Sequence, residues 1–170
     1  MKKAVVFLLL LAFVLNFSAC ETDLGAPVRF CYLRDPEAIR YGSADGVLAW
    51  EDRDLSGNRE PEYLLTLYFS GPLEQCLVSP FPEGTAVDEL VLHQRNLILV
   101  MNQKLRELSG VALTEAYACI ARTCFSMMEV SQVTILIPEF GELDASSITL
   151  TRDSVALLDD VLPTGANEST

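Results

Sequence analysis

The stretch YLLTLYFSGP, residues 63–72, is dense in Leu, Tyr and Phe and yet stops on Gly-Pro. Strict alternation of apolar and polar residues fails in it, whereas four residues follow the i, i+3, i+4, i+7 spacing of one helical face. These four residues are Leu64, Leu67, Tyr68 and Gly71. Gly71 suits the left-handed position just after a last turn, and Pro72 prevents continuation. The stretch therefore predicts a core-packing helix with a sharp end.

Two strands are predicted before this helix. Residues 27–34 are rich in aromatic and β-branched side chains, and residues 46–53 follow a turn-rich segment, so the two are expected to form a hairpin or flank a loop. The connector at 55–62 contains Asn58, which is expected to cap a helix that starts near Pro61.

A β-hairpin is predicted after the helix. The turn-rich connector 79–85 leads into two apolar arms within 85–102, which are separated by the polar residues 94–96. The second arm, 97–101, has no polar alternate, which indicates a strand that is covered on both faces or central in a sheet.

An amphipathic helix is predicted at 112–127, followed by a buried strand at 133–138. The core face of that helix is expected to hold Leu113, Tyr117, Ile120, Cys124 and Met127, with Glu115, Arg122 and Ser126 opposite. Residues 147–158 are expected to add a strand and a short element. This order of elements predicts an α+β fold: a small mixed β-sheet, two helices packed on one face, and a short C-terminal extension.

The first twenty residues have the layout of an export signal, with Lys2 and Lys3 followed by an apolar run at 4–15. That run would span about 18 Å as a helix, well short of the ~30 Å hydrocarbon core, so a permanent transmembrane helix is not expected. The segment FSAC, residues 17–20, resembles a bacterial lipobox, which predicts lipidation of Cys20 after removal of 1–19. A plain secreted protein with a chance cysteine is the alternative.

The expected consequence is a protein anchored by palmitate-like acyl chains to the outer face of the cell membrane, with 20–26 as a short tether. The mature chain would hold 10 basic and 24 acidic residues, a net charge of −14. Such a balance argues against nucleic-acid binding and against docking on anionic lipid through a basic surface.

No catalytic, metal or cofactor motif is found in the sequence. Cys31, Cys76, Cys119 and Cys124 permit three disulfide pairings, but buried unpaired thiols explain them equally well. The helical positions place Cys124 on the core face and Cys119 on the polar side, so Cys119 is the better candidate for a reactive thiol. His93 has no metal-ligand spacing to any cysteine, and a solvated turn residue is expected.

Six segments carry a resemblance to a known family: AWEDRDL (49–55), LLTLYFSGP (64–72), SPFPEGTAVDEL (79–90), LILVMNQKL (97–105), ALTEAYACIARTCFSM (112–127) and VTILI (133–137). In this order they resemble a GerMN domain, the module named for a spore-germination and sporulation lipoprotein of endospore-forming bacteria. Pro82, Gly84 and Thr85 match the family's Pro-x-Gly-Thr turn. With Gly71 and Pro72, they are the expected fold-defining turns.

The resemblance covers 27–138, with 139–162 as an extension that packs on the domain and 163–170 as a disordered tail. It implies a small α+β module related to the ring-building domains of secretion-type assemblies, used for contacts between proteins and not for catalysis. The leading hypothesis is a non-enzymatic interaction or assembly module in sporulation, germination or another envelope process, with envelope proteins as partners and a homo-oligomer allowed. The alternative is a lipoprotein that binds a small solute or a cell-wall fragment.

Overall fold

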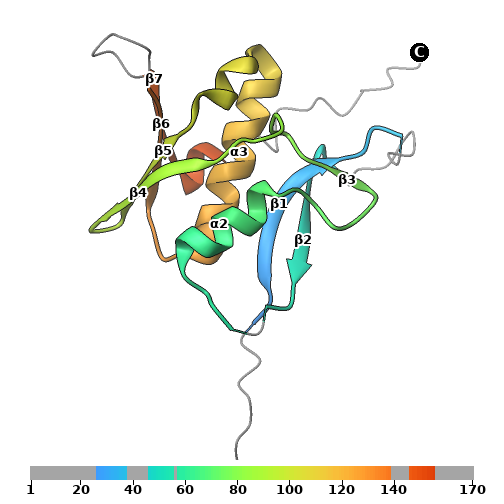
Figure 1. Cartoon of the computed structure of the whole chain (residues 1–170), viewed down its shortest axis with the longest axis horizontal. Helices are drawn as coiled ribbons and strands as arrows, with labels where there is room; N and C mark the ends of the chain where they lie inside the picture. The colour runs from blue at the N-terminus through green and yellow to red at the C-terminus, as the bar shows by residue number, and fades with distance from the viewer. Residues whose placement is uncertain (1–25, 38–45, 56, 139–145, 156–170) are drawn as a thin grey trace, which may run out of the picture.

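The computed structural model describes residues 26–37, 46–55, 57–138 and 146–155 (Figure 1). The expected signal peptide, Cys20 and the expected tail at 163–170 lie outside these residues. In chain order the elements are β1 (Val28–Arg34), β2 (Leu48–Arg53), α2 (Pro61–Phe69), β3 (Leu77–Val78), β4 (Val87–His93), β5 (Asn96–Met101), the 3-10 helix η1 (Gln103–Glu107), α3 (Gly110–Met127), β6 (Gln132–Ile137) and β7 (Ser146–Thr151). Within the described residues, no helix is long and apolar enough to cross a membrane.

The first sheet has the strand order β2-β1-β3 and is antiparallel. The predicted hairpin of the first two strands is confirmed, with Val28 opposite Arg53 and Leu33 opposite Leu48. Side chains alternate between the faces of a strand, and Ala49, Glu51 and Arg53 are therefore the buried residues of β2.

The second sheet has the order β4-β5-β6-β7 and is mixed, because β5 and β6 run parallel while the outer pairs are antiparallel. The predicted hairpin is confirmed, and Gln94 turns it with a φ of 58°. As predicted, β5 is central. Its two faces differ, since Leu97, Leu99 and Met101 are fully buried while the residues between them are half-buried.

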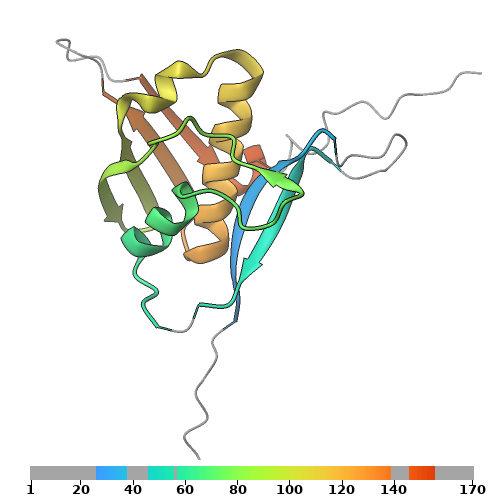
Figure 2. The same ribbon diagram turned by 45° about the vertical axis from the view of Figure 1, so that its right-hand side comes forward.

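Helix α3 lies between the two sheets and contacts β1 on one side and β6 on the other (Figures 1 and 2). The α+β class and the mixed sheet are confirmed, but the strands divide between two sheets because β1, β2 and β3 pair only with one another. Ile120 and Cys124 are buried as predicted. The expected polar side of the helix is wrong for Cys119, which is fully buried, because β1 covers that side as well.

Helix α2 begins at Pro61 as predicted and packs against β4 (Figure 1). The expected cap by Asn58 is wrong, because the N-cap residue is Glu60. The Asn58 side chain instead accepts a hydrogen bond of 2.8 Å from the Glu60 backbone N–H, which forms a turn before the helix. Leu64, Leu65 and Tyr68 are the buried residues of the helix.

Part of the expected C-terminal extension belongs to the second sheet, because β7 pairs with β6. Its Leu150 is buried opposite Val133 of β6, and a short helical turn at 152–155 follows it. Residues 139–145 and 156–170 lie outside the described part of the chain.

Candidate functional site

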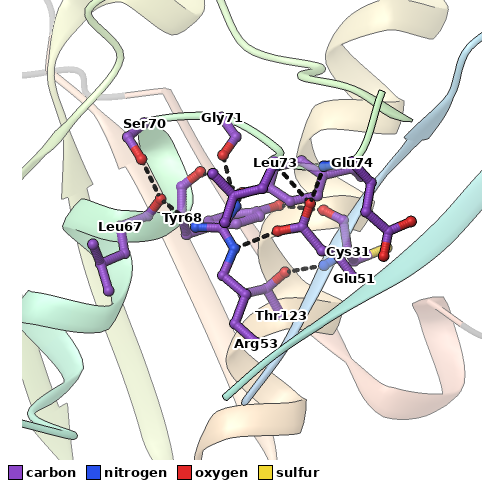
Figure 3. Close-up of polar contacts among 11 residues, drawn as sticks. Cys31, Glu51, Arg53, Leu67, Tyr68, Ser70, Gly71, Leu73, Glu74 and Thr123 are labelled. Carbon is purple, nitrogen blue, oxygen red and sulfur yellow. Dashed lines mark hydrogen bonds and ion pairs between the residues drawn. The ribbon is translucent and has the colours of Figure 1, made fainter. Parts of the chain in front are cut away.

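Glu51 and Arg53 form an ion pair on the inner face of β2 (Figure 3). They are two residues apart on one strand, so both side chains point to the same face. The exposed fractions of the two side chains are 2% and 7%, and the Arg53 guanidinium lies 4.8 Å from the centre of the Phe30 ring. Such a pair is costly to desolvate, and further hydrogen bonds are needed to compensate.

Arg53 supplies those bonds to the end of α2. Its Nη2 donates to the Gly71 carbonyl at 2.7 Å, and its Nη1 donates to the Leu67 carbonyl at 3.3 Å. The last carbonyls of a helix have no partner within the helix and carry a partial negative charge. A buried guanidinium at this position therefore stabilises the C-terminal end of α2.

Glu51 holds the other side of the same turn. Its Oε2 accepts hydrogen bonds from the backbone N–H groups of Leu73 at 2.7 Å and Glu74 at 3.0 Å (Figure 3). Gly71 has a φ of 98°, the left-handed conformation that favours glycine. The ion pair thus holds the chain immediately before and after the Gly-Pro turn.

Two tyrosines join this network to α3. The Tyr32 hydroxyl donates to the Tyr68 carbonyl, and the Tyr68 hydroxyl donates to the Cys31 carbonyl, each at 2.8 Å. Burial raises the pKa of Tyr32, against the opposing effect of Arg53, and burial raises the pKa of Tyr68. Both hydroxyls therefore stay protonated as donors. Cys31 in turn donates its backbone N–H to Thr123 Oγ1 of α3 at 2.9 Å.

The second expected turn, at 82–85, is closed by its own hydrogen bonds. The Thr85 backbone N–H and hydroxyl both donate to the Pro82 carbonyl, at 3.1 and 2.8 Å. Gly84 has a φ of 82°, and its carbonyl accepts a bond of 2.7 Å from the Asn102 side chain. The turn is thereby tied to the end of the β5 strand.

These two turns border one groove with a volume of about 550 Å³. Four of the five predicted turn residues line it, and Pro72 is the one outside its lining. The four are Gly71, Pro82, Gly84 and Thr85. Phe69 and Phe81 form apolar walls, and their rings meet edge to face with centroids 5.0 Å apart. The two sequence-predicted turns, which are about ten residues apart in the chain, therefore border one surface, and the whole lining falls within residues 66–86.

The groove lining combines apolar rings with hydroxyl groups. Among the described residues that line it, the single charged side chain is Glu83, and the hydroxyls come from Thr66, Ser70, Ser79 and Thr85. His93 lies exposed at the tip of the β4–β5 hairpin, away from this lining. Over the described part of the chain, no cluster of His, Cys, Asp and Glu could hold a metal ion.

The thiols do not form a reactive centre at the groove. Cys31, Cys76, Cys119 and Cys124 are free, and the Sγ atoms of Cys31 and Cys119 lie 3.9 Å apart in the core. The choice of Cys119 as the better candidate for a reactive thiol is wrong, because its hydrogen bond with Cys31, and then its burial, raise its pKa well above the usual value. Burial likewise raises the pKa of Cys124 to about 12. Of the four cysteines that the structure describes, Cys76 is the exposed one.

Sequence reasoning missed the Glu51–Arg53 pair as part of the site. Charged residues are seldom buried, and a hairpin strand with acidic and basic residues is usually taken as a solvated face. The alternation along the strand also favoured the other face, because Leu48 and Trp50 are larger and more apolar than Ala49.

The chain was compared with known proteins at three levels. Neither a scan of protein-family models nor a search of curated proteins gave a match. A search of solved structures found similarity to the tandem GerMN domains of the sporulation protein GerM from Bacillus subtilis, with a TM-score of 0.48 and 21% sequence identity. The match covers 75% of this chain and 44% of that chain, so this chain spans less than half the length of that structure.

Proposed function

We propose that this chain is a membrane-anchored, extracytoplasmic lipoprotein with a GerMN-like domain that acts as a non-enzymatic interaction module. The FSAC segment at 17–20 supports the anchor, and the order of the six motifs supports the domain. The proposed setting is the assembly of a protein complex at the cell envelope, in sporulation, germination or a related process.

The observation that carries this proposal is the groove between the end of α2 and the turn at 82–85. Its apolar walls, Phe69 and Phe81, are flanked by hydroxyl groups and by turn backbone. An apolar cavity with a few polar groups suits one or two side chains of a partner peptide. Because Glu51 and Arg53 hold its edge in place, little ordering entropy should be lost on binding.

We propose that the protein also forms a homo-oligomer, and the edge strand β4 supports this. It pairs with β5 on one side only among the described strands, and its Val91 and Leu92 side chains are 38% and 56% exposed. Unpaired edge strands with apolar side chains readily pair with another chain. A second copy of this protein is the partner that we propose for this edge.

The proposal is tested by recovering partners from native membranes with the tagged full-length protein. Glu83 is exposed in the groove, so Glu83→Lys should reverse the local charge without disturbing the core. Glu129→Lys makes the same change on an exposed residue outside the groove lining and is the matched control. We expect the first variant to lose specific partners that the second retains. Equal recovery by both variants would contradict the assignment of the groove.

A further inference from the structure

A second cavity, of about 250 Å³, lies between the first sheet, the end of α3 and the turn at 152–155. Three arginines line it, one from each of these places: Arg29 from β1, Arg122 from α3 and Arg152 from the turn. No acidic side chain is among the described residues of its lining. In a chain with 24 acidic and 12 basic residues, this is an unusual concentration of positive charge.

Two of the guanidinium groups are held in place. Arg152 Nη2 donates to the Phe125 carbonyl at 2.8 Å, and its guanidinium lies 4.9 Å from the centre of the Phe125 ring. Arg29 lies 4.9 Å from the centre of the Trp50 ring. The aromatic faces therefore orient the two arginines at the cavity wall.

Arg29 already binds a carboxylate, since its Nε lies 2.9 Å from Asp52 Oδ1. The Arg29 and Asp52 side chains are 51% and 55% exposed, and exposed ion pairs of this kind contribute little free energy. The anionic oxygens of a ligand can thus replace the Asp52 carboxylate as the partner of Arg29 at a small cost in free energy. The contact of the Arg29 Nε with Asp52 Oδ1 is the kind of contact that the ligand oxyanion would make.

We propose that this cavity binds a small molecule that carries one oxyanion, a carboxylate or a phosphate, on an apolar or aromatic body. Guanidinium groups recognise both oxyanions through paired hydrogen bonds. Trp50, Phe125 and Val155 supply the apolar surface that would cover the body of the ligand. The cavity is smaller than typical drug-sized pockets, which favours a compact ligand.

The negative net charge of the chain also favours small ligands over polyanions. At −12 for the whole sequence, long-range repulsion acts against polyanions such as nucleic acid or an anionic membrane surface. A ligand with one or two negative charges is repelled much less and is attracted locally by the three arginines. This site is independent of the groove, so it goes beyond the proposed interaction function.

Trp50 provides a direct readout, because it is the single tryptophan of the chain and lines the cavity. The experiment titrates the full-length protein in detergent with benzoate, phenyl phosphate and the neutral analogue benzamide, and follows tryptophan fluorescence. We expect a saturable change with at least one anion, with a Kd roughly in the millimolar range for ligands of this size. The two anions distinguish a carboxylate ligand from a phosphate ligand.

Variants locate the binding. Arg29→Gln and Arg152→Gln should each weaken binding roughly tenfold, as expected for the loss of a charged hydrogen bond. Arg59→Gln removes an exposed arginine outside the cavity lining and should leave binding unchanged. Because Arg29 is half exposed, its replacement should not unfold the protein, and a thermal melt checks this. No saturable change with either anion, equal binding of benzamide, or unchanged binding in Arg29→Gln would overturn the proposal.

Discussion

Glu51 and Arg53 form a buried ion pair that binds both sides of the turn after α2, with Arg53 on the Gly71 carbonyl and Glu51 on the Leu73 backbone N–H. Removing one partner leaves an uncompensated buried charge. Arg53→Met should therefore lower the free energy of unfolding by about 3–5 kcal/mol, measured by urea denaturation. The exposed pair provides the control, since Arg29→Met should cost less than about 1 kcal/mol. Equal losses in the two variants would show that the buried pair has no special role.

The turn at Gly71 should depend on its left-handed conformation. A Cβ built on Gly71 meets nothing within 4 Å, so Gly71→Val should destabilise through backbone strain alone, by about 1–3 kcal/mol. Gly46→Val is a matched control, because its added Cβ also meets open space and its φ is not in the left-handed region. Thermal unfolding of the two variants compares them. A melting temperature that falls equally in both would contradict the role assigned to the turn.

The stability of the fold should fall at high pH. Burial raises the pKa of Cys124 to about 12, so the folded state binds more protons than the unfolded state once pH exceeds the unfolded value of about 8.5. The stabilising contribution is complete below that pH and is lost as pH rises toward 12. Cys124→Ala should make the decline in unfolding free energy shallower between pH 9 and pH 11, by up to about 1.4 kcal/mol per pH unit. If the unfolding free energy falls equally steeply with pH in the wild type and in Cys124→Ala, the buried thiol is not a cause of the decline.

Thiol accessibility separates Cys76 from the three buried cysteines. A maleimide reagent should label the native protein once, at Cys76, and Cys76→Ser should abolish that labelling. After denaturation, Cys31, Cys119 and Cys124 should react as well. Cys20 should stay unlabelled if a thioether-linked lipid occupies its sulfur, and mass spectrometry reads both results. Native labelling of Cys119 would contradict the packing of α3 against β1.

Self-association through β4 can be tested at its most exposed apolar residue. Leu92→Lys places a charge on the edge strand, which should weaken pairing of two copies and shift sedimentation toward the monomer. Leu73→Lys changes a residue that is even more exposed, at 77%, outside the strand. A monomeric wild type at micromolar concentration, or the same shift in both variants, would count against this interface.

Local pattern predicted most of the elements correctly. The i, i+3, i+4 spacing and the Gly-Pro ending located α2, and polar residues 94–96 located the β4–β5 hairpin. The resemblance to the GerMN family also placed Pro82, Gly84 and Thr85 in one turn. These features depend on residues close together in sequence, which is why the sequence alone indicates them.

Long-range packing accounts for what could not be predicted. A single helical wheel assumes one covered side, but α3 is covered by both sheets, and this buried Cys119 against Cys31. Likewise, the inward turn of Glu51 and Arg53 depends on α2 supplying carbonyl and N–H partners from another part of the chain. The groove is lined by a single segment, residues 66–86, but its shape depends on how the two turns of that segment fold back on each other, which local pattern does not indicate.

The central claim is that the groove at the end of α2 contacts a partner protein outside the cytoplasmic membrane. Site-specific photo-cross-linking in native membranes tests it most directly, with the photoreactive residue at Glu83 and, as the control, at exposed Glu129, which lies outside the groove lining. The account predicts a discrete adduct with an envelope protein from position 83, identified by mass spectrometry and absent from position 129. No adduct above background at position 83, or the same adducts from both positions, would contradict it.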